Sequence, residues 1–499
     1  MLPEAEKYYG EKLRVLADAD IRSARRNEPE GISEIKKVHL TGVCGTAMGS
    51  LAGLFQEAGY EVSGSDEKCY PPMSDFIKDN NIKFYEGFDA GNVMGKDLSV
   101  TANMFGADNT EAVAVRNNFL PQLSMASAIN KFFIKDRKSL VVCGTHGKTT
   151  TTGLLEHVFT VCGRDPGYLV GGIPVGSEKS YHVGSGEYFI IEGDEYDTSY
   201  FDKSPKFLHY NPYIAIVTSI ELDHVDIYRD LEDYKQAFRF LAQIVKPEGL
   251  LILCKENLNT LELMNFTKAK VVTYGFDESA NIFAKDIKND ESGQSADLYM
   301  NKVLLGRITT PLFGKYNLLN TLSVITAALH EGIDFENISH SLKLFNGMKR
   351  RQEIIGIVNG ITVIDDFAHH PTAVRETLSG IRERFLGRRI VVFFEPRSVT
   401  SRRKIFEADY ASSFGNADMI FLSTPALRSV DDPKDFIDPN IVAGLIREKG
   451  KQVYALNNAG EVLEKALPLL KSDDVVVIMS NSSFDGIHKK LLEKLKDLN

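Results

Sequence analysis

The sequence predicts an α/β protein of three domains, with a Rossmann-like first domain and a P-loop ATPase domain in the middle. Three patterns support this prediction: a strand, glycine turn, helix and strand that start at Lys37, an apolar strand that runs into the loop GTHGKTT, and a later alternation of strands and helices. Such alternation is typical of parallel sheets. The 499 residues suit about three domains of roughly 100–200 residues each. We expect a polar leader over 1–36 and domains over 37–135, 136–346 and 347–499.

The composition argues against several classes of protein. The formal net charge of -10 and the pI of about 5.7 argue against nucleic-acid binding, which usually requires a basic face. The sequence has no run of about 18 apolar residues and its charged N-terminus lacks a signal-peptide core, so we expect no membrane insertion. The five cysteines are odd in number, widely spaced and without a CxxC pair. This pattern indicates a reduced, cytoplasmic protein without a zinc site.

The first βαβ unit contains a glycine turn. KVHLT reads as a strand, LAGLFQEAG as a helix and YEVSGSD as the next strand. The glycines Gly42, Gly45 and Gly49 depart from the GxGxxG pattern, and Asp66 lies where a Rossmann acid meets a ribose. A nicotinamide-dependent oxidoreductase is therefore one alternative for this chain.

The strongest local signal is the loop that follows the strand SLVVC and precedes the helical stretch TTTTGLLEHVFTVCG. Its residues are Gly144, Thr145, His146, Gly147, Lys148, Thr149 and Thr150. Glycines let backbone N–H groups approach phosphate oxygens, and the helix N-terminus adds positive charge. Lys148 can bridge the β- and γ-phosphates of ATP, and the Thr149 hydroxyl can bind Mg²⁺. The strict pattern has glycine where this chain has Val142, so the loop is a shortened P-loop.

The P-loop leaves a second alternative open, a regulatory protein that hydrolyses ATP without forming a bond between substrates. However, a glycine turn at residue 42 together with a P-loop at residue 144 suggests two phosphate-bearing ligands. A nucleotide-linked substrate plus ATP explains both.

Two predicted strands downstream of the P-loop carry acidic clusters. YFIIEGDEYD carries Glu192, Asp194, Glu195 and Asp197, and YIAIVTSIELDHVDIY ends in Glu221, Asp223, His224 and Asp226. Magnesium prefers hard oxygen donors. On two strands of one sheet beside a P-loop, these clusters predict a Mg²⁺ site.

The third region opens with basic residues near an expected hinge, Lys349, Arg350 and Arg351. A guanidinium that reaches a γ-phosphate would stabilise charge during phosphoryl transfer. The segment DDFAHHPT places His369 and His370 at the end of a strand. No third ligand stands at suitable spacing, and adjacent strand residues point to opposite faces, so a ribose or base contact is favoured over zinc.

Together these motifs resemble those of the muramyl ligase family of cell-wall enzymes. The resemblance spans about residues 37–495 and is carried by GTHGKTTTT, EGDEYD, SIELDHVD, GKYNLLN, RRQE and DDFAHHPT. It implies a Rossmann-like N-terminal domain for a UDP-sugar, a central ATPase domain and a Rossmann-like C-terminal domain for the incoming amine. The implied reaction is ATP-dependent ligation of UDP-N-acetylmuramate through an acyl phosphate.

The resemblance also implies roles for single residues. It assigns ATP binding to the P-loop residues above and to Asn317, Asn320, Arg350, Arg351, Asp366 and His370. It assigns Mg²⁺ to Thr149, Glu195 and His224, and catalysis to Lys148, Glu195, His224 and Arg351. It places UDP at Gly42, Gly45 and Asp66.

Within the family, the amine substrate depends on the third domain. The branch that adds free L-alanine has a QPHRYTRT-like stretch after a C-terminal strand, whereas this chain has Glu395-Pro-Arg397-Ser398. This stretch, with SNSSFDGIH near the C-terminus, resembles the branch that adds L-alanyl-γ-D-glutamyl-meso-diaminopimelate. That resemblance implies that Arg397 and Ser398 contact the murein tripeptide. Ligation of L-alanine is the alternative within the family.

Overall fold

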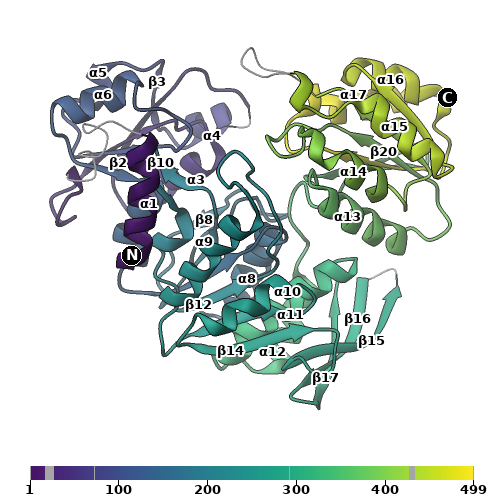
Figure 1. Cartoon of the computed structure of the whole chain (residues 1–499), viewed down its shortest axis with the longest axis horizontal. Helices are drawn as coiled ribbons and strands as arrows, with labels where there is room; N and C mark the ends of the chain where they lie inside the picture. Colours follow the sequence, from purple (N-terminus) through teal and green to yellow (C-terminus); the bar gives the residue numbers. More distant parts are fainter. Residues whose placement is uncertain (1, 17–26, 72, 291–292, 426–432, 498–499) are drawn as a thin grey trace.

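A computed structural model describes residues 2–71, except 17–26, and residues 73–497, except 291–292 and 426–432. The described chain forms three α/β units, each around its own main sheet (Figure 1). The N-terminal and C-terminal units lie side by side above the central unit in this view. No helix among the described residues is both long and apolar enough to cross a bilayer.

The N-terminal unit is a five-stranded parallel sheet in the order β3-β2-β1-β4-β5. This is a Rossmann-like strand order, because successive strands are added on one side of β1 up to β3 and on its other side from β4 onward. The strands are β1 (Lys37–Thr41), β2 (Glu61–Asp66), β3 (Lys83–Glu86), β4 (Leu98–Thr101) and β5 (Gln122–Ser124). The helices are α3 (Thr46–Glu57), α4 (Met73–Asp79), α5 (Ala90–Val93), α6 (Thr110–Asn117) and α7 (Met125–Ile129).

The central unit has a ten-stranded sheet in the order β17-β16-β15-β14-β13-β12-β6-β9-β7-β8. Its middle strands are parallel and mostly apolar, as suits a sheet covered by helices on both faces. The strands are β6 (Lys138–Cys143), β7 (Gly167–Leu169), β8 (Tyr181–His182), β9 (Tyr188–Gly193), β12 (Ile214–Val217), β13 (Leu250–Cys254), β14 (Lys270–Gly275), β15 (Ile282–Asp290), β16 (Gly293–Met300) and β17 (Val303–Thr310). The covering helices include α8 (Lys148–Val161), α9 (Leu231–Ile244), α10 (Leu258–Leu261), α11 (Lys315–His330) and α12 (Phe335–Leu344).

Two additions to this sheet were not predicted. Strands β15, β16 and β17 form an antiparallel extension, and β10 (Asp197–Ser199) and β11 (Asp202–Pro205) form a separate hairpin. The hairpin strands are only three and four residues long, too short to give a clear strand pattern in the sequence.

The C-terminal unit is a six-stranded sheet in the order β18-β19-β23-β20-β21-β22. Residues on the two faces alternate between two apolar clusters; Val392 and Phe394 belong to one cluster and Val391 and Phe393 to the other. The strands are β18 (Glu353–Val358), β19 (Ile361–Asp366), β20 (Ile390–Phe394), β21 (Met419–Ser423), β22 (Gln452–Leu456) and β23 (Val475–Met479). The helices are α13 (Pro371–Arg384), α14 (Glu407–Ser413), α15 (Pro439–Glu448), α16 (Ala459–Ala466) and α17 (Ile487–Lys496).

Two of the hydrogen bonds between the C-terminal and central units involve acids that follow β12. The Thr372 hydroxyl donates to Glu221 over 2.7 Å, and the Thr400 hydroxyl donates to Asp223 over 2.5 Å. Both threonines come from loops or helix starts at the carboxyl edge of the C-terminal sheet, and both acids follow β12. Ligands of parallel sheets bind at such carboxyl edges. The two edges therefore face one another across a single interdomain site.

The contact between the N-terminal and central units depends on a glycine. A Cβ at Gly53 in α3 would lie 2.1 Å from the ring of Tyr181 in β8. Tyr181 is buried and packs edge-on against Phe76, so its ring has little freedom to move away.

We predict that Gly53→Ala lowers the free energy of unfolding by roughly 1–3 kcal/mol, the usual cost of overpacking a filled interior. Gly444 in α15 is the matched control, because a Cβ there would meet no atom within 4 Å. Gly444→Ala should raise stability by about 0.5–1 kcal/mol, since alanine favours a helix interior over glycine. Denaturant unfolding of both variants checks the pair, and equal effects would contradict this packing argument.

Candidate active site

The P-loop turns between β6 and α8 on two glycines with left-handed backbone. Gly144 has φ of 123° and Gly147 has φ of 83°. A Cβ at Gly147 would lie 2.6 Å from the side-chain oxygen of Asn320. Side chains other than hydrogen are therefore excluded here both by conformation and by space. The helix begins at Lys148, so its first N–H groups face the loop, as anion binding requires.

Lys148 is paired with a buried carboxylate. Its ammonium lies 2.9 Å from Glu195 and donates to the Gly144 carbonyl over 2.6 Å. Burial disfavours the charge, yet Glu195 and Asp194 together raise the pKa of Lys148. Lys148 is thus a fixed cation at the helix N-terminus.

The four acids of the first cluster, Glu192, Asp194, Glu195 and Asp197, have different partners. The strand ends at Gly193, so Asp194 and Glu195 lie in the following loop and not in the predicted strand. Asp194 pairs with Lys206 at 3.2 Å and Asp197 with Lys203 at 2.5 Å. Glu195 has no exposed side-chain surface, and it pairs with both Lys148 and His224. Of the acids after the end of β9, Glu195 is the one that contacts both Lys148 and His224.

Glu195, Asp223 and His224 form a cluster whose ligand atoms lie within 4.8 Å of one another. Strand β12 ends at Val217, so the second acidic cluster is also in a loop. Burial opposes the charge of His224, but Glu195 and Asp223 raise its pKa to about 9. At neutral pH a proton on His224 therefore supplies positive charge between two carboxylates. A divalent cation would replace this proton, since an imidazole binds a metal only in its neutral form, and the two carboxylates and the imidazole would then supply its ligands.

Thr149 lies between the acidic residues and the C-terminal unit. Its hydroxyl lies 3.3 Å from Glu192, and Arg351 donates to it over 3.2 Å. Arg351 thus reaches the P-loop from the start of the third unit. The guanidinium also lies 4.7 Å from the ring centroid of Phe367, which holds it in position.

The neighbouring Arg350 points elsewhere. It has φ of 59° and donates to the Ser480 and Ser482 carbonyls over 2.8 and 2.7 Å. It also pairs with Asp365 at 3.3 Å. The structure therefore places Arg350 inside the C-terminal unit and Arg351 at the P-loop.

The residues expected to hold adenosine lie around the same edge. Asn317 and Asn320 are buried on α11 and hydrogen bond to each other over 3.3 Å. Asp366, at the end of β19, accepts from the backbone N–H groups of Gln352 and Ala368, both over 2.8 Å. Burial raises the pKa of the Asp366 carboxyl.

His370 gathers with His146 and Glu221, which sequence spacing did not reveal. Their ligand atoms lie within 4.8 Å of one another, so groups that could act as further ligands are close in space although none stands at suitable spacing in the sequence. His369 and His370 also follow β19, rather than lying in it, and His370 caps α13. The Nδ1 atom of His370 accepts from the Thr372 N–H over 3.3 Å, which puts the proton on Nε2. Nε2 is buried without a partner, so it is a donor suited to an oxygen acceptor rather than to a metal.

The glycine turn of the N-terminal unit follows β1. Gly42 has φ of 89°, and a Cβ there would lie 2.4 Å from the ring of Phe105. Asp66, at the end of β2, accepts from the Cys44 N–H over 3.0 Å. Gly45 starts α3 as its N-cap residue. Gly42, Gly45 and Asp66 therefore share one carboxyl edge, as predicted from their spacing.

The cysteine prediction is wrong for one pair. Cys44 in this turn and Cys69 after β2 form a disulfide, with Cα atoms 5.6 Å apart. Residues 25 positions apart in sequence meet because β1 and β2 are adjacent parallel strands whose ends lie together. Cys143, Cys162 and Cys254 are free thiols.

The expected amine-binding residues lie after β20. Arg397 is exposed and forms no ion pair within the described part of the chain. Ser398 caps a turn by accepting from the Ser401 N–H over 2.9 Å. Ser482, from the C-terminal motif, donates to Glu395 over 2.8 Å. These residues therefore all lie in loops that follow β20 and β23, at the carboxyl edge of the C-terminal sheet.

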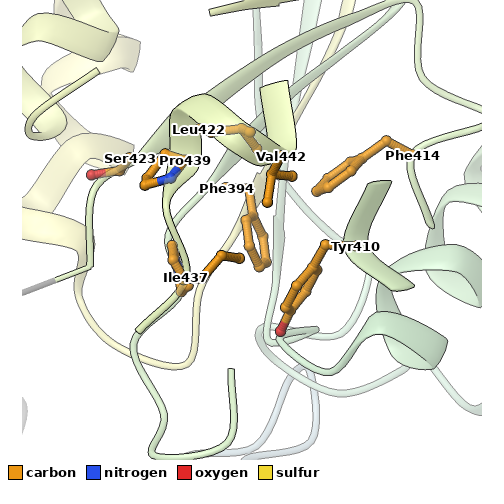
Figure 2. A pocket seen from close by; sticks show the side chains of 9 residues that line it. Phe394, Tyr410, Phe414, Leu422, Ser423, Ile437, Pro439 and Val442 are labelled. Carbon is orange, nitrogen blue, oxygen red and sulfur yellow. The ribbon is translucent and has the colours of Figure 1, made fainter. Parts of the chain in front are cut away.

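A small apolar pocket lies beside this edge (Figure 2). The rings of Phe394, Tyr410 and Phe414 line one part of it, and Pro396 joins it to the Arg397 loop. The lining carries no charged side chain. This pocket is thus not the phosphate or cation site described above.

Three family models match the chain in succession. The model described as Mur ligase family, catalytic domain, matches residues 37–137, the Mur ligase middle domain matches 142–328, and the glutamate ligase domain matches 350–482. The chain belongs to the Mur ligase family. It is therefore an ATP-dependent ligase with the three-domain α/β fold of that family, and the oxidoreductase and regulatory alternatives are set aside.

Individual relatives match over nearly their whole length. The UDP-N-acetylmuramate--L-alanyl-gamma-D-glutamyl-meso-2,6-diaminoheptandioate ligase of Escherichia coli is 36% identical over 92% of this chain and 98% of that protein. The UDP-N-acetylmuramate--L-alanine ligase of Caldanaerobacter subterraneus is 31% identical over 93% of this chain and 99% of that protein. The crystal structure of a murein peptide ligase from Psychrobacter arcticus has a TM-score of 0.70 at 29% identity, covering 93% of this chain and 99% of that one.

The adjacent arginines provide a direct test of the site geometry. We predict that Arg351→Met reduces turnover by about 10²–10³, the cost of losing one preorganised electrostatic donor, with little change in melting temperature. Arg350→Met should instead lower the free energy of unfolding by about 1–3 kcal/mol, because buried carbonyls lose their donors. Steady-state kinetics and thermal unfolding of both variants check this. The reverse assignment of the two effects would refute the placement of Arg351 at the P-loop.

Proposed function

We propose that the enzyme joins the lactyl carboxylate of UDP-N-acetylmuramate to the amine of L-alanyl-γ-D-glutamyl-meso-diaminopimelate, with ATP as the energy source, in peptidoglycan recycling. The observation that carries this proposal is the 36% identity, over 98% of its length, to an Escherichia coli ligase named for those substrates. The site geometry supports the chemistry, since a P-loop, an acidic cluster and an arginine converge between two sheets. We infer that the reaction takes place in the cytoplasm, where nucleotide substrates are found, without nucleic acid or membrane insertion.

In the first step the γ-phosphoryl group of ATP passes to the lactyl carboxylate. A carboxylate is too poor an acceptor for an amine, and phosphorylation gives it a leaving group. Lys148 and Arg351 lie on either side of Thr149 and bring two cations to the developing phosphate charge. Such fixed charges lower the barrier without reorganising during the reaction. The amine then attacks the acyl phosphate, an amide forms and inorganic phosphate leaves.

Magnesium would be held by Thr149, Glu195 and His224, with Asp223 as a further donor in the same cluster. When bound, it would neutralise charge on the transferring phosphoryl group. The residues themselves orient this site. Tyr228 donates to the Glu195 carbonyl, and Glu195 fixes Lys148.

The remaining ATP contacts are assigned to the P-loop residues 144–150, to Asn317 and Asn320 for adenine, and to Asp366 for ribose. His370 offers its buried Nε2 proton to an oxygen of the nucleotide or of a bound reactant. Arg350 is a supporting residue in this arrangement, because its donors are occupied by the Ser480 and Ser482 carbonyls.

UDP is assigned to the first unit, where Gly42 and Gly45 open the turn and Asp66 lies at the adjacent strand end. The tripeptide is assigned to the third unit. Its several carboxylates suit Arg397, whose exposed guanidinium can bind one of them through two N–H groups. Ser398 lies beside Arg397 and gives a small side chain where a longer ligand needs room.

A second candidate is ligation of free L-alanine, which the 31% identity to the Caldanaerobacter enzyme favours. We predict that kcat/KM for the tripeptide exceeds that for L-alanine by about 10² or more, because a site built for several carboxylates leaves polar groups unpaired with the smaller amine. Parallel assays with UDP-N-acetylmuramate, ATP and Mg²⁺, read by mass spectrometry of the products, test this. A preference for L-alanine would overturn the tripeptide assignment and leave the ligase chemistry intact.

We further predict that Lys148→Ala reduces turnover by about 10²–10³ or more, because the lysine charge stabilises the phosphoryl group during its transfer. Lys489→Ala, on the exposed face of α17, is the control and should ligate normally. Circular dichroism shows whether each variant is folded. Near-normal ligation by folded Lys148→Ala protein would refute the assignment of this loop to ATP.

A further inference from the structure

Helix α1 (Pro3–Leu16) packs against β11 of the central unit (Figure 1). It precedes the first family match, which begins at residue 37. Ala5, Tyr9 and Leu13 recur at helical spacing and are almost wholly buried. This row is enough to dock the helix, since one apolar stripe is what a surface helix needs.

A second row, Tyr8 and Lys12, meets a buried acid. The Tyr8 hydroxyl donates to Asp233, and the Lys12 ammonium lies 3.3 Å from it. The side chain of Asp233 is only 1% exposed. A carboxylate so buried is costly unless it is paired, and α1 supplies two of its partners.

Asp233 and its neighbours connect Tyr8 and Lys12 to the cluster of Glu195 and His224. Asp233 accepts from the Arg229 N–H over 3.3 Å, directly after Tyr228. The Lys12 ammonium also lies 5.3 Å from the centroid of the Tyr228 ring. The Tyr228 N–H donates to the His224 carbonyl over 3.0 Å, and its hydroxyl donates to the Glu195 carbonyl. Tyr228 thus donates hydrogen bonds to the backbone carbonyls of both His224 and Glu195.

The loop needs such support. His224 has φ of 50°, a left-handed backbone that a non-glycine residue adopts at a cost. Strain of this kind persists only where the surroundings fix it. Tyr228, held from outside by α1, is placed to do so.

We infer that Tyr8 and Lys12 are positioning residues, which hold Tyr228 and Asp233 so that Glu195 and His224 keep the geometry for a divalent cation. This inference rests on the proposed cation site. The N-terminal helix is in this sense an added part of the active-site support, separate in sequence from the three matched domains.

The test measures Mn²⁺ binding to the full-length enzyme with ADP, by electron paramagnetic resonance of free Mn²⁺. The variants are Tyr8→Phe, Lys12→Met and Tyr228→Phe, with Lys7→Met on the exposed face of α1 as the matched control. Changes in residues that orient metal ligands typically cost 10–100-fold in affinity, and these lie one layer further out. We expect the dissociation constant for Mn²⁺ to rise about three- to tenfold in each variant, and Lys7→Met to have no effect.

Two features separate positioning from mere docking. The affinity for UDP-N-acetylmuramate should not change, and Lys12→Arg should restore normal Mn²⁺ affinity. Combining Lys12→Met with Tyr228→Phe should give less than the sum of the two effects, because both act through the position of Tyr228. A lower melting temperature with unchanged Mn²⁺ affinity in Tyr8→Phe and Lys12→Met would overturn the inference.

Glu195→Gln distinguishes this failure from failure of the cation site. If Glu195→Gln weakens Mn²⁺ binding and the helix variants do not, the inference alone is wrong. If Glu195→Gln has no effect, the cation assignment fails and the inference fails with it. Loss of tripeptide ligation with normal Mn²⁺ behaviour would instead count only against the proposed substrate.

Discussion

The buried ion pair between Lys148 and Glu195 organises the active site. Glu195 is fully buried, and its 2.9 Å contact with Lys148 joins the P-loop to the loop after β9. Burial of either charge alone would be costly, and removal of one partner from such a pair is more damaging than the pair is stabilising. The rest of the site follows from this constraint: His224 pairs with the other oxygen of Glu195, and Asp223 pairs with Thr400 of the third unit.

The same constraint explains why nearby acids are not equivalent. Lys206 and Lys203 satisfy Asp194 and Asp197, so these acids have their own local cations. Glu195 faces Lys148 and a protonated His224, and negative charge still remains on Asp223 and Glu192 nearby. A site with this balance suits a ligand that brings both phosphate and a divalent cation, because each part finds an opposite charge already fixed.

Sequence patterns were sufficient for several strands and for the P-loop. The strands predicted at KVHLT, YEVSGSD and SLVVC appear within about one residue of those bounds as β1, β2 and β6, because short apolar-rich runs between turns suit strands inside a covered sheet. Most of these acids were placed on predicted strands and lie in loops, because sequence does not show where β9 and β12 stop pairing; Glu192 is in β9 and Asp197 begins β10. Arg350 and Arg351 were interchangeable in the sequence. They differ because a left-handed turn at Arg350 sends adjacent side chains to different units. The disulfide and the meeting of His146 with His370 depend on tertiary contacts, which no local pattern records.

The interdomain contacts show how an open fold can still build one reaction centre. Thr372 and Thr400 donate to Glu221 and Asp223, which lie in the loop just before His224. Separation of the third unit would remove both donors, leave two carboxylates without these partners and withdraw Arg351 from Thr149. The C-terminal unit therefore does more than carry the amine, because its docking completes the charge arrangement around the P-loop. Domain closure of this kind also excludes water, which would otherwise hydrolyse an acyl phosphate before the amine attacks.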